Sequence, residues 1–255
     1  MAAMKRSQQN NGLAGEAYVI LRERILRGEF SIGQVISRRK LALELGMSFL
    51  PVTDAMLRLE NEGLLESRPR AGTRVRVPSL EDVRGHYVVR EALEVQAAKL
   101  FAVTAMPEER TELLKLAARV DHLSSRQEPD RFYYLKLHET LHLRISECAR
   151  CPALAEAIDK THALSSTWRC GAHVLPAGEP RRTHQDLMEV LTQGDPVAAG
   201  QAMSEHIQLA LQNSLRRLQP YFEIADKLGE TYSRSATKQR ELESLRSKNA
   251  EAVAD

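Results

Sequence analysis

Four residues between positions 37 and 63 constrain the fold more than any other feature of this sequence. Ser37 is suited to cap the N-terminus of a short helix, and Gly46 is suited to end that helix in the left-handed conformation. Ser48 then caps a second helix, which has a proline early in it, and Gly63 closes it. Two short helices joined by a glycine turn predict a helix-turn-helix.

The segments on either side complete this pattern. Before it, residues 14–26 place apolar side chains at helical spacing, which predicts a further helix. After it, residues 73–77 alternate polar and β-branched side chains, which predicts a hairpin with its tip near Ala71 and Gly72. Three helices followed by a hairpin are the layout of a winged helix-turn-helix, in which the hairpin is the wing.

The rest of the chain is predicted to be almost entirely helical. Ser79 and Asp82 form a capping signature directly after the linker residue Pro78. Helix-breaking segments then divide the sequence into about six or seven helices; they lie at 106–107, 127–129, 150–152, 174–180 and 194–196. We therefore expect a mainly α protein, with an N-terminal winged helix-turn-helix and a C-terminal all-α helical bundle.

The expected domains differ in charge. We expect a disordered N-terminus at 1–13, the winged helix-turn-helix at 14–78, the helical domain at 79–220, and a charged tail at 221–255 that is a frayed helix or disordered. Residues 1–78 contain 13 lysines and arginines against 8 aspartates and glutamates, although the whole chain has a net charge of only +2. A basic first third indicates contact with a polyanion such as DNA.

Cysteine usage and hydropathy indicate the compartment. The three cysteines are few and odd in number, and no signal peptide is recognisable, so we expect a reducing cytoplasm. No apolar run approaches the about 18 residues that a membrane span needs, so we expect no membrane segment. Cys148 and Cys151, with Cys170, form an isolated CxxC-type group, which only weakly suggests a thiolate metal site.

Several ordered motifs resemble one known family. They are LRERILRG at 21–28, LALELGMS at 41–48, PV at 51–52, LRLENEGL at 57–64, RPRAG at 68–72 and VREALE at 89–94. Together with the segments 138–154 and 184–206, they resemble the GntR family of bacterial regulators, in the branch with an FCD effector domain. The resemblance covers about residues 14–215. It implies a dimeric, ligand-controlled DNA-binding protein, most often a repressor.

The resemblance assigns the DNA-contacting residues. The second helix of the motif enters the major groove and the wing enters the minor groove. We expect contacts at the start of both helices and along the wing, from Arg38, Arg39, Lys40, Ser48, Phe49, Leu50, Thr53, Arg68, Arg70, Gly72 and Thr73. Relatives usually have arginine at the positions of Phe49 and Thr53, so the operator is expected to differ from the usual one. Packing of Phe49 and Leu50 inside the domain is the alternative interpretation.

Four histidines interrupt the apolar stripes of the predicted C-terminal helices. They are His138, His142, His184 and His206. A lone inward histidine is usually a core residue with ordinary partners, but four of them, two at i,i+4 spacing, are better explained by one shared cation. The family resemblance implies a metal site at these positions, with His138 replacing the usual aspartate. A set of four nitrogen ligands favours a divalent transition metal, Zn²⁺ or Ni²⁺, over harder ions.

Arg90 matches a family arginine near the ligand cavity, and its guanidinium suits a carboxylate. A structural salt bridge with Glu91 or Glu94 is the alternative. The function we expect is a regulator whose affinity for a short inverted repeat in double-stranded DNA is controlled by a small organic acid. The alternatives are direct metal sensing and a metal-dependent hydrolase. We expect no enzyme, because no general base or nucleophile motif is visible in the sequence.

Overall fold

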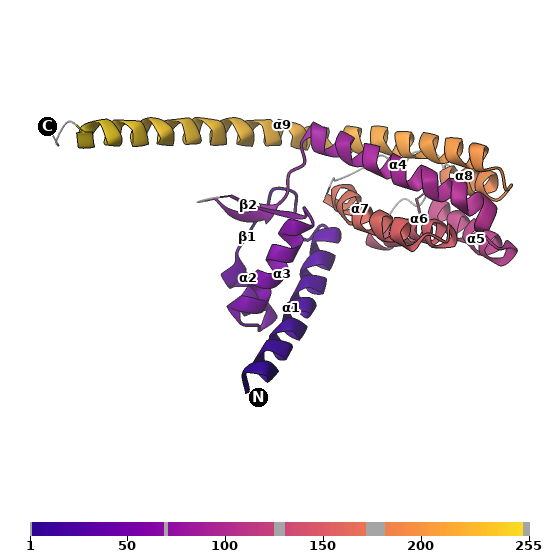
Figure 1. Cartoon of the computed structure of the whole chain (residues 1–255), viewed down its shortest axis with the longest axis horizontal. Helices are drawn as coiled ribbons and strands as arrows, with labels where there is room; N and C mark the ends of the chain where they lie inside the picture. The colour runs from indigo at the N-terminus through magenta and orange to yellow at the C-terminus, as the bar shows by residue number, and fades with distance from the viewer. Residues whose placement is uncertain (1, 69–70, 125–130, 172–181, 252–255) are drawn as a thin grey trace.

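The computed structural model describes residues 2–68, 71–124, 131–171 and 182–251. Figure 1 shows an N-terminal domain that lies beside one end of a larger helical bundle. The segment after β3 connects the two domains. This division agrees with the expected fold class, a winged helix-turn-helix followed by an all-α bundle.

In its described residues, the N-terminal domain contains three helices and a small sheet. The helices are α1 (Ala2–Leu26), α2 (Arg38–Leu45) and α3 (Phe49–Asn61). The strands are β1 (Val35–Ile36), β2 (Leu65–Arg68) and β3 (Gly72–Val75), arranged antiparallel in the order β1-β3-β2. The hairpin of β2 and β3 is the predicted wing.

The predicted caps position the two helices of the motif. The Ser37 hydroxyl accepts a hydrogen bond from the backbone N–H of Lys40 at 3.3 Å, and Gly46 has a φ of 63°. That left-handed conformation favours glycine and allows the chain to turn sharply into α3. Ser48 occupies the N-cap position of α3, but its side chain makes no capping hydrogen bond.

The inner face of α3 holds the domain together. Val52, Met56 and Leu59 are fully buried at helical spacing and pack against α1 and the sheet. The opposite face of α3 exposes apolar side chains, among them Leu57. Because burial fixes the rotation of α3, its first turn is presented to solvent.

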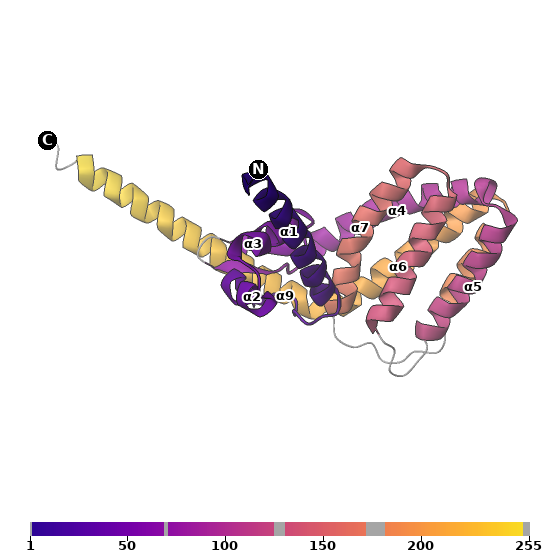
Figure 2. The same cartoon turned by 90° about the horizontal axis from the view of Figure 1, so that it is seen from below.

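Within the residues that the structure describes, the C-terminal domain is a bundle of six helices. These are α4 (Leu80–Thr104), α5 (Pro107–Ser124), α6 (Arg131–Cys148), α7 (Pro152–Gly171), α8 (Thr183–Leu191) and α9 (Pro196–Glu251). Helix α4 begins at the predicted capping box of Ser79 and Asp82 and packs along α9, where the hydroxyls of Tyr87 and Ser214 are 2.6 Å apart. Figure 2 shows α5, α6 and α7 side by side next to this pair.

Three of the predicted breaks are confirmed by helices that begin at proline. Pro107, Pro152 and Pro196 are the first residues of α5, α7 and α9. Proline suits this position because its fixed φ is helical and its missing N–H has no partner there.

The two ends of the chain are both helical, which at the C-terminus is one of the two alternatives that the sequence predicted. Helix α1 begins at Ala2, within the segment that the sequence predicted to be disordered, and residues 2–11 contain neither glycine nor proline to interrupt it. Helix α9 continues to Glu251, beyond the body of the bundle (Figure 1). Phe222 is buried in the core, so the helical domain extends past the expected boundary at residue 220.

Within the described ranges, no helix is both long and apolar enough to span a lipid bilayer.

Candidate functional site

The first turn of α3 presents apolar and hydroxyl groups to solvent. Phe49 and Leu50 expose 55% and 54% of their surface, so they do not pack inside the domain. The Thr53 hydroxyl donates to the Phe49 carbonyl at 2.9 Å, which leaves its oxygen able to accept. Such a turn can contact thymine methyl groups and hydrogen-bond donors on base edges.

The three cations at the start of α2 point in different directions. Arg39 and Lys40 are exposed, as expected of phosphate contacts. Arg38 instead lies partly buried, with its Nη2 donating to Glu60 and Thr73 at 3.1 Å each. Successive residues on a helix are rotated by about 100°, so neighbours in sequence need not share a face.

Side chains of the wing make more interactions within the domain than its sequence predicted. Arg68 and Arg74 both form ion pairs with Glu66, at 3.4 Å and 2.6 Å. Thr73 is only 5% exposed and its hydroxyl lies inside a polar network, so in this structure it is a structural residue rather than a surface contact. Gly72 is exposed, with a φ of 79°. The predicted contact Arg70 lies outside the described residues.

The structure brings the four predicted histidines together in the bundle. His138 and His142 come from α6, His184 from α8 and His206 from α9. Their ligand atoms all lie within 4.8 Å of one another; His206 is partly buried and the others are buried. Ring centroids of adjacent pairs are 4.6 to 5.3 Å apart. Helical spacing alone placed His138 and His142 on one face; the bundle adds the other two.

Buried carboxylates orient two of these rings. Glu94 Oε2 lies 2.6 Å from His142 Nδ1, and Asp121 Oδ1 lies 2.6 Å from His184 Nδ1. Asp121 also accepts hydrogen bonds from the backbone N–H groups of His184 and Gln185, which fixes the carboxylate. A carboxylate at Nδ1 favours the proton there and leaves the Nε2 lone pair available.

The Nε2 atoms of His142 and His184 are buried and have no hydrogen-bond partner among the described residues. An unpaired buried nitrogen costs free energy unless something binds it. The burial of both Nε2 atoms, and the bonds that Nδ1 makes to Glu94 and Asp121, leave both Nε2 lone pairs available to a ligand. The donor set therefore fits a divalent transition ion, which binds neutral imidazole nitrogen.

Electrostatics keep this cluster in the form that binds metal. Burial lowers the pKa of His142 to about 4, and burial together with the neighbouring His184 and His142 holds the pKa of His206 well below its usual range. Burial acts to raise the pKa of Glu94, but Arg90, His162 and His142 outweigh it and hold that pKa well below its usual range. At neutral pH the two histidines are neutral and Glu94 is charged.

Arg90 forms the predicted salt bridge with Glu94, and one of its guanidinium nitrogens has no hydrogen-bond partner among the described residues. It is 1% exposed, and its Nε donates to Glu94 at 2.7 Å. Its Nη1 is buried and has no hydrogen-bond partner among the described residues. Glu91 instead binds Ser204 and Gln208. The salt bridge and a free donor therefore coexist on one guanidinium.

Sequence reasoning missed the residues behind the histidines. No sequence pattern marked Asp121 as a functional residue, because its partner His184 lies 63 positions away. Glu94 was visible only as a salt-bridge partner of Arg90. His162 had no pattern either, yet it joins Glu94 and His142 in a second compact group, with Nε2 3.3 Å from Glu94 Oε1.

The thiolate alternative receives no support from the described cysteines. Cys148 is buried and Cys151 partly buried, and both are free thiols. Burial raises the pKa of Cys148 to about 11, which disfavours the thiolate that metal binding requires. The side chain of Cys170 lies outside the described residues.

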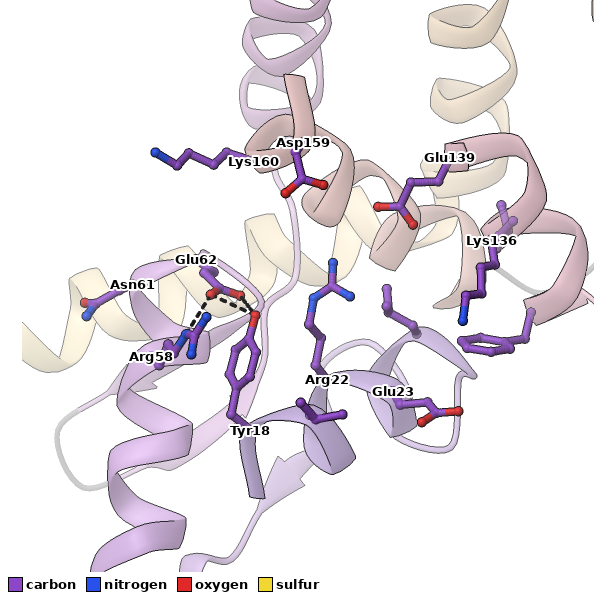
Figure 3. A pocket seen from close by; sticks show the side chains of 14 residues that line it. Tyr18, Arg22, Glu23, Arg58, Asn61, Glu62, Lys136, Glu139, Asp159 and Lys160 are labelled. Atoms are coloured by element: carbon purple, nitrogen blue, oxygen red, sulfur yellow. Dashed lines mark hydrogen bonds and ion pairs between the residues drawn. The ribbon is translucent and has the colours of Figure 1, made fainter. Parts of the chain in front are cut away.

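A cavity of about 820 Å³ that the sequence did not predict lies between the two domains (Figure 3). Its walls come from α1, the end of α3, the first half of α6 and α7. On the N-terminal side, Glu62 accepts from Tyr18 and from Arg58 at 2.9 Å and 3.3 Å. Arg22 points into the cavity, between Asp159 and Glu139 of the facing domain (Figure 3).

Comparison with known proteins agrees with this geometry. Residues 13–75 match the bacterial regulatory proteins of the gntR family, and residues 86–209 match the FCD domain. The HTH-type transcriptional repressor RspR of Escherichia coli K12 is 26% identical over 206 residues, which cover 80% of this chain and 89% of that protein. The probable D-xylose utilization operon transcriptional repressor of Paenarthrobacter nicotinovorans is 26% identical over 184 residues, covering 72% and 80%.

Solved structures share the fold. E. coli McbR/YncC superposes with a TM-score of 0.67 at 21% identity, and a GntR regulator from Rhodococcus sp. RHA1 with a TM-score of 0.63 at 20% identity. Each comparison covers 82% of this chain and 98% of the other. The matched families and curated relatives are DNA-binding transcription regulators and not enzymes, which excludes the hydrolase alternative.

Proposed function

Because the chain belongs to the GntR family of bacterial transcription regulators and carries an FCD domain, we propose that it is a cytoplasmic repressor whose affinity for DNA is set by a small organic acid at a metal centre. Two of its relatives are themselves named as repressors. The observation that carries the proposal is the pair of buried, unpaired Nε2 atoms on His142 and His184, each backed by a carboxylate.

For DNA binding we propose a homodimer on a short inverted repeat, with one α3 helix in each major groove. The exposed first turn of α3 reads base edges, and the exposed cations of α2 contact phosphate together with the arginines of the wing. The residues proposed to contact DNA are Arg39, Lys40, Ser48, Phe49, Leu50, Thr53, Arg68, Arg70 and Gly72.

For the metal we propose ligation by His138, His142, His184 and His206. FCD domains commonly bind a metal, and the compact nitrogen set here suits Zn²⁺ or Ni²⁺ better than a hard ion. Such an ion supplies a Lewis acid that attracts a carboxylate oxygen. Glu94 and Asp121 hold the proton at Nδ1 of their histidines, so that Nε2 faces the centre.

For the effector we propose a small carboxylic acid that reaches both the histidine cluster and Arg90. The Nη1 group of Arg90 is a buried donor that a carboxylate would satisfy, because charge-assisted hydrogen bonds are among the strongest in proteins. Glu94 holds the guanidinium in place through Nε, and Glu94 also contacts His142. The same carboxylate therefore fixes both halves of the proposed effector site.

For the coupling between sites we propose a route through α6. This helix carries His138 and His142, and its first half also lines the cavity against the DNA-binding domain through Leu135 and Glu139. A small shift of α6 on effector binding would change the histidine cluster and the cavity between the domains at the same time. Such coupling is reciprocal, so operator DNA would weaken effector binding by the same factor.

The test is a titration of operator affinity with a panel of small carboxylic acids, in metal-loaded and chelator-treated protein. We expect one class of acid to release DNA from the loaded protein only. Release by metal alone, without an acid, would instead identify a direct metal sensor. An acid response that survives complete metal removal would contradict the metal-dependent site.

A further inference from the structure

One polar network joins the wing to the recognition helix. Arg38 Nη2 donates to Glu60 Oε1 and Thr73 Oγ1 at 3.1 Å each, and lies 3.4 Å from Ser67 Oγ. Ser67 Oγ lies 2.6 Å from both Glu60 Oε1 and Thr73 Oγ1. Three side chains, from α2, β2 and β3, therefore meet around one carboxylate oxygen of α3.

The fold makes this meeting point rigid. Ser67 and Thr73 are directly opposite each other in the β2–β3 hairpin, and Thr73 is also paired with Ile36 of β1. Arg38 follows Ile36 by two positions and Glu60 lies in the last turn of α3. Rotation of the wing relative to α3 would break hydrogen bonds to Glu60, because Ser67 and Thr73 of the wing both bond to its carboxylate.

Burial separates this network from the surface that meets DNA. The side chains of Arg38 and Glu60 are 31% and 18% exposed, and Thr73 is 5% exposed. Arg39, the next residue, is exposed. A guanidinium committed to a carboxylate has its charge neutralised locally, so it contributes little to phosphate attraction.

We propose that Arg38 and Glu60 are positioning residues for DNA recognition: they fix the angle between the wing and the recognition helix, and Arg38 itself does not contact DNA. The wing and α3 must enter different grooves at the same time. A preformed angle removes the cost of ordering the wing on binding. Arg38 was expected to be a contact like Arg39, and the network assigns it a different role.

The sign of the effect at Glu60 gives the sharpest test. Removing an acid from a DNA-binding surface should strengthen binding through simple electrostatics. If Glu60 positions the wing, Glu60→Ala should instead weaken binding about tenfold, the effect of losing one charge-assisted hydrogen bond. The measurement uses the intact protein and a DNA fragment selected by the wild type from random sequence. Asp54→Ala, an exposed acid on the same helix, is the matched control for the electrostatic effect.

The salt dependence of binding separates positioning from contact. Loss of one phosphate contact lowers the slope of log affinity against log salt by about 0.9. We expect that reduction in Arg39→Ala and an unchanged slope in Arg38→Ala, although both bind more weakly. Equal reductions in the two variants, or a Glu60→Ala variant that binds as tightly as wild type or more so, would overturn the proposal.

Exchanging the two charges distinguishes a loss of positioning from a loss of folding. In the double variant Arg38→Glu with Glu60→Arg, the ion pair is rebuilt in reverse, and we expect most of the lost affinity to return. Thermal unfolding of each variant shows whether the domain is intact. A folded double variant that binds no better than Glu60→Ala would contradict the proposed role of the pair.

Discussion

The two domains keep their functional polar groups in opposite environments. In the DNA-binding domain, Arg39 and Lys40 are exposed and surround an apolar turn. In the helical domain, Arg90 and His142 are almost completely buried and are held by Glu94. Exposed charges suit a large polyanion that approaches from outside, whereas buried ones suit a small ligand that is enclosed. The same residue types therefore have different energetic consequences in the two domains.

The largest expected effect breaks a buried pair. Glu94→Ala leaves the Arg90 guanidinium buried without its partner, which should destabilise the protein by roughly 3–5 kcal/mol. Glu23→Ala, which removes the exposed partner of Arg27 on α1, should cost about 0–1 kcal/mol. Denaturant unfolding of both variants measures the contrast. Equal losses of stability would contradict the difference between the domains.

The next effect concerns binding rather than stability. Arg39→Ala should weaken operator binding by roughly 1–3 kcal/mol and leave the unfolding temperature unchanged, because an exposed cation supports no other residue. Fluorescence anisotropy with operator DNA, together with a thermal melt, tests both parts. A variant that binds DNA normally would remove Arg39 from the interface.

A substitution in the cavity between the domains should have a smaller effect, on the response to effector. Arg22 points across it toward Asp159 and Glu139 (Figure 3), so Arg22→Ala should reduce the effector-induced change in DNA affinity by about 0.5–2 kcal/mol. Metal content should not change. Lys115→Ala, an exposed cation on α5, is the control. An unaltered effector response in Arg22→Ala would show that communication bypasses the cavity.

The smallest effect is expected at the C-terminus. Truncation at Ala225 keeps Phe222, the last core residue among those whose burial the structure describes, so folding and operator binding should match those of the full chain. A truncated protein that precipitates or loses DNA binding would show that the end of α9 packs on the body.

Local patterns predicted the N-terminal domain well. Ser37, Gly46 and the alternating wing each act through neighbours in sequence, and the structure has the expected caps and hairpin. The orientation of individual side chains was harder to predict from the sequence. Arg38 and Arg39 look alike in sequence, and only the packing of α2 against α3 and the sheet separates them.

The metal-ligand candidates and their supports were unequally predictable. The histidines interrupt apolar stripes, which marks them as inward-facing one helix at a time. Their carboxylate partners come from other helices: Asp121 lies on α5 and Glu94 on α4. No periodicity encodes a contact between helices, so the tautomer of each histidine could be inferred only from the assembled bundle.

Metal content of single histidine variants tests the central claim most directly. Elemental analysis should find about one divalent transition ion per chain in the wild type and in His122→Ala, whose histidine is exposed on α5 and lies outside the cluster. His142→Ala and His184→Ala should contain none and should unfold at lower temperature, because the ion connects three helices. A metal-free wild type that still releases DNA in response to its organic acid would contradict the account.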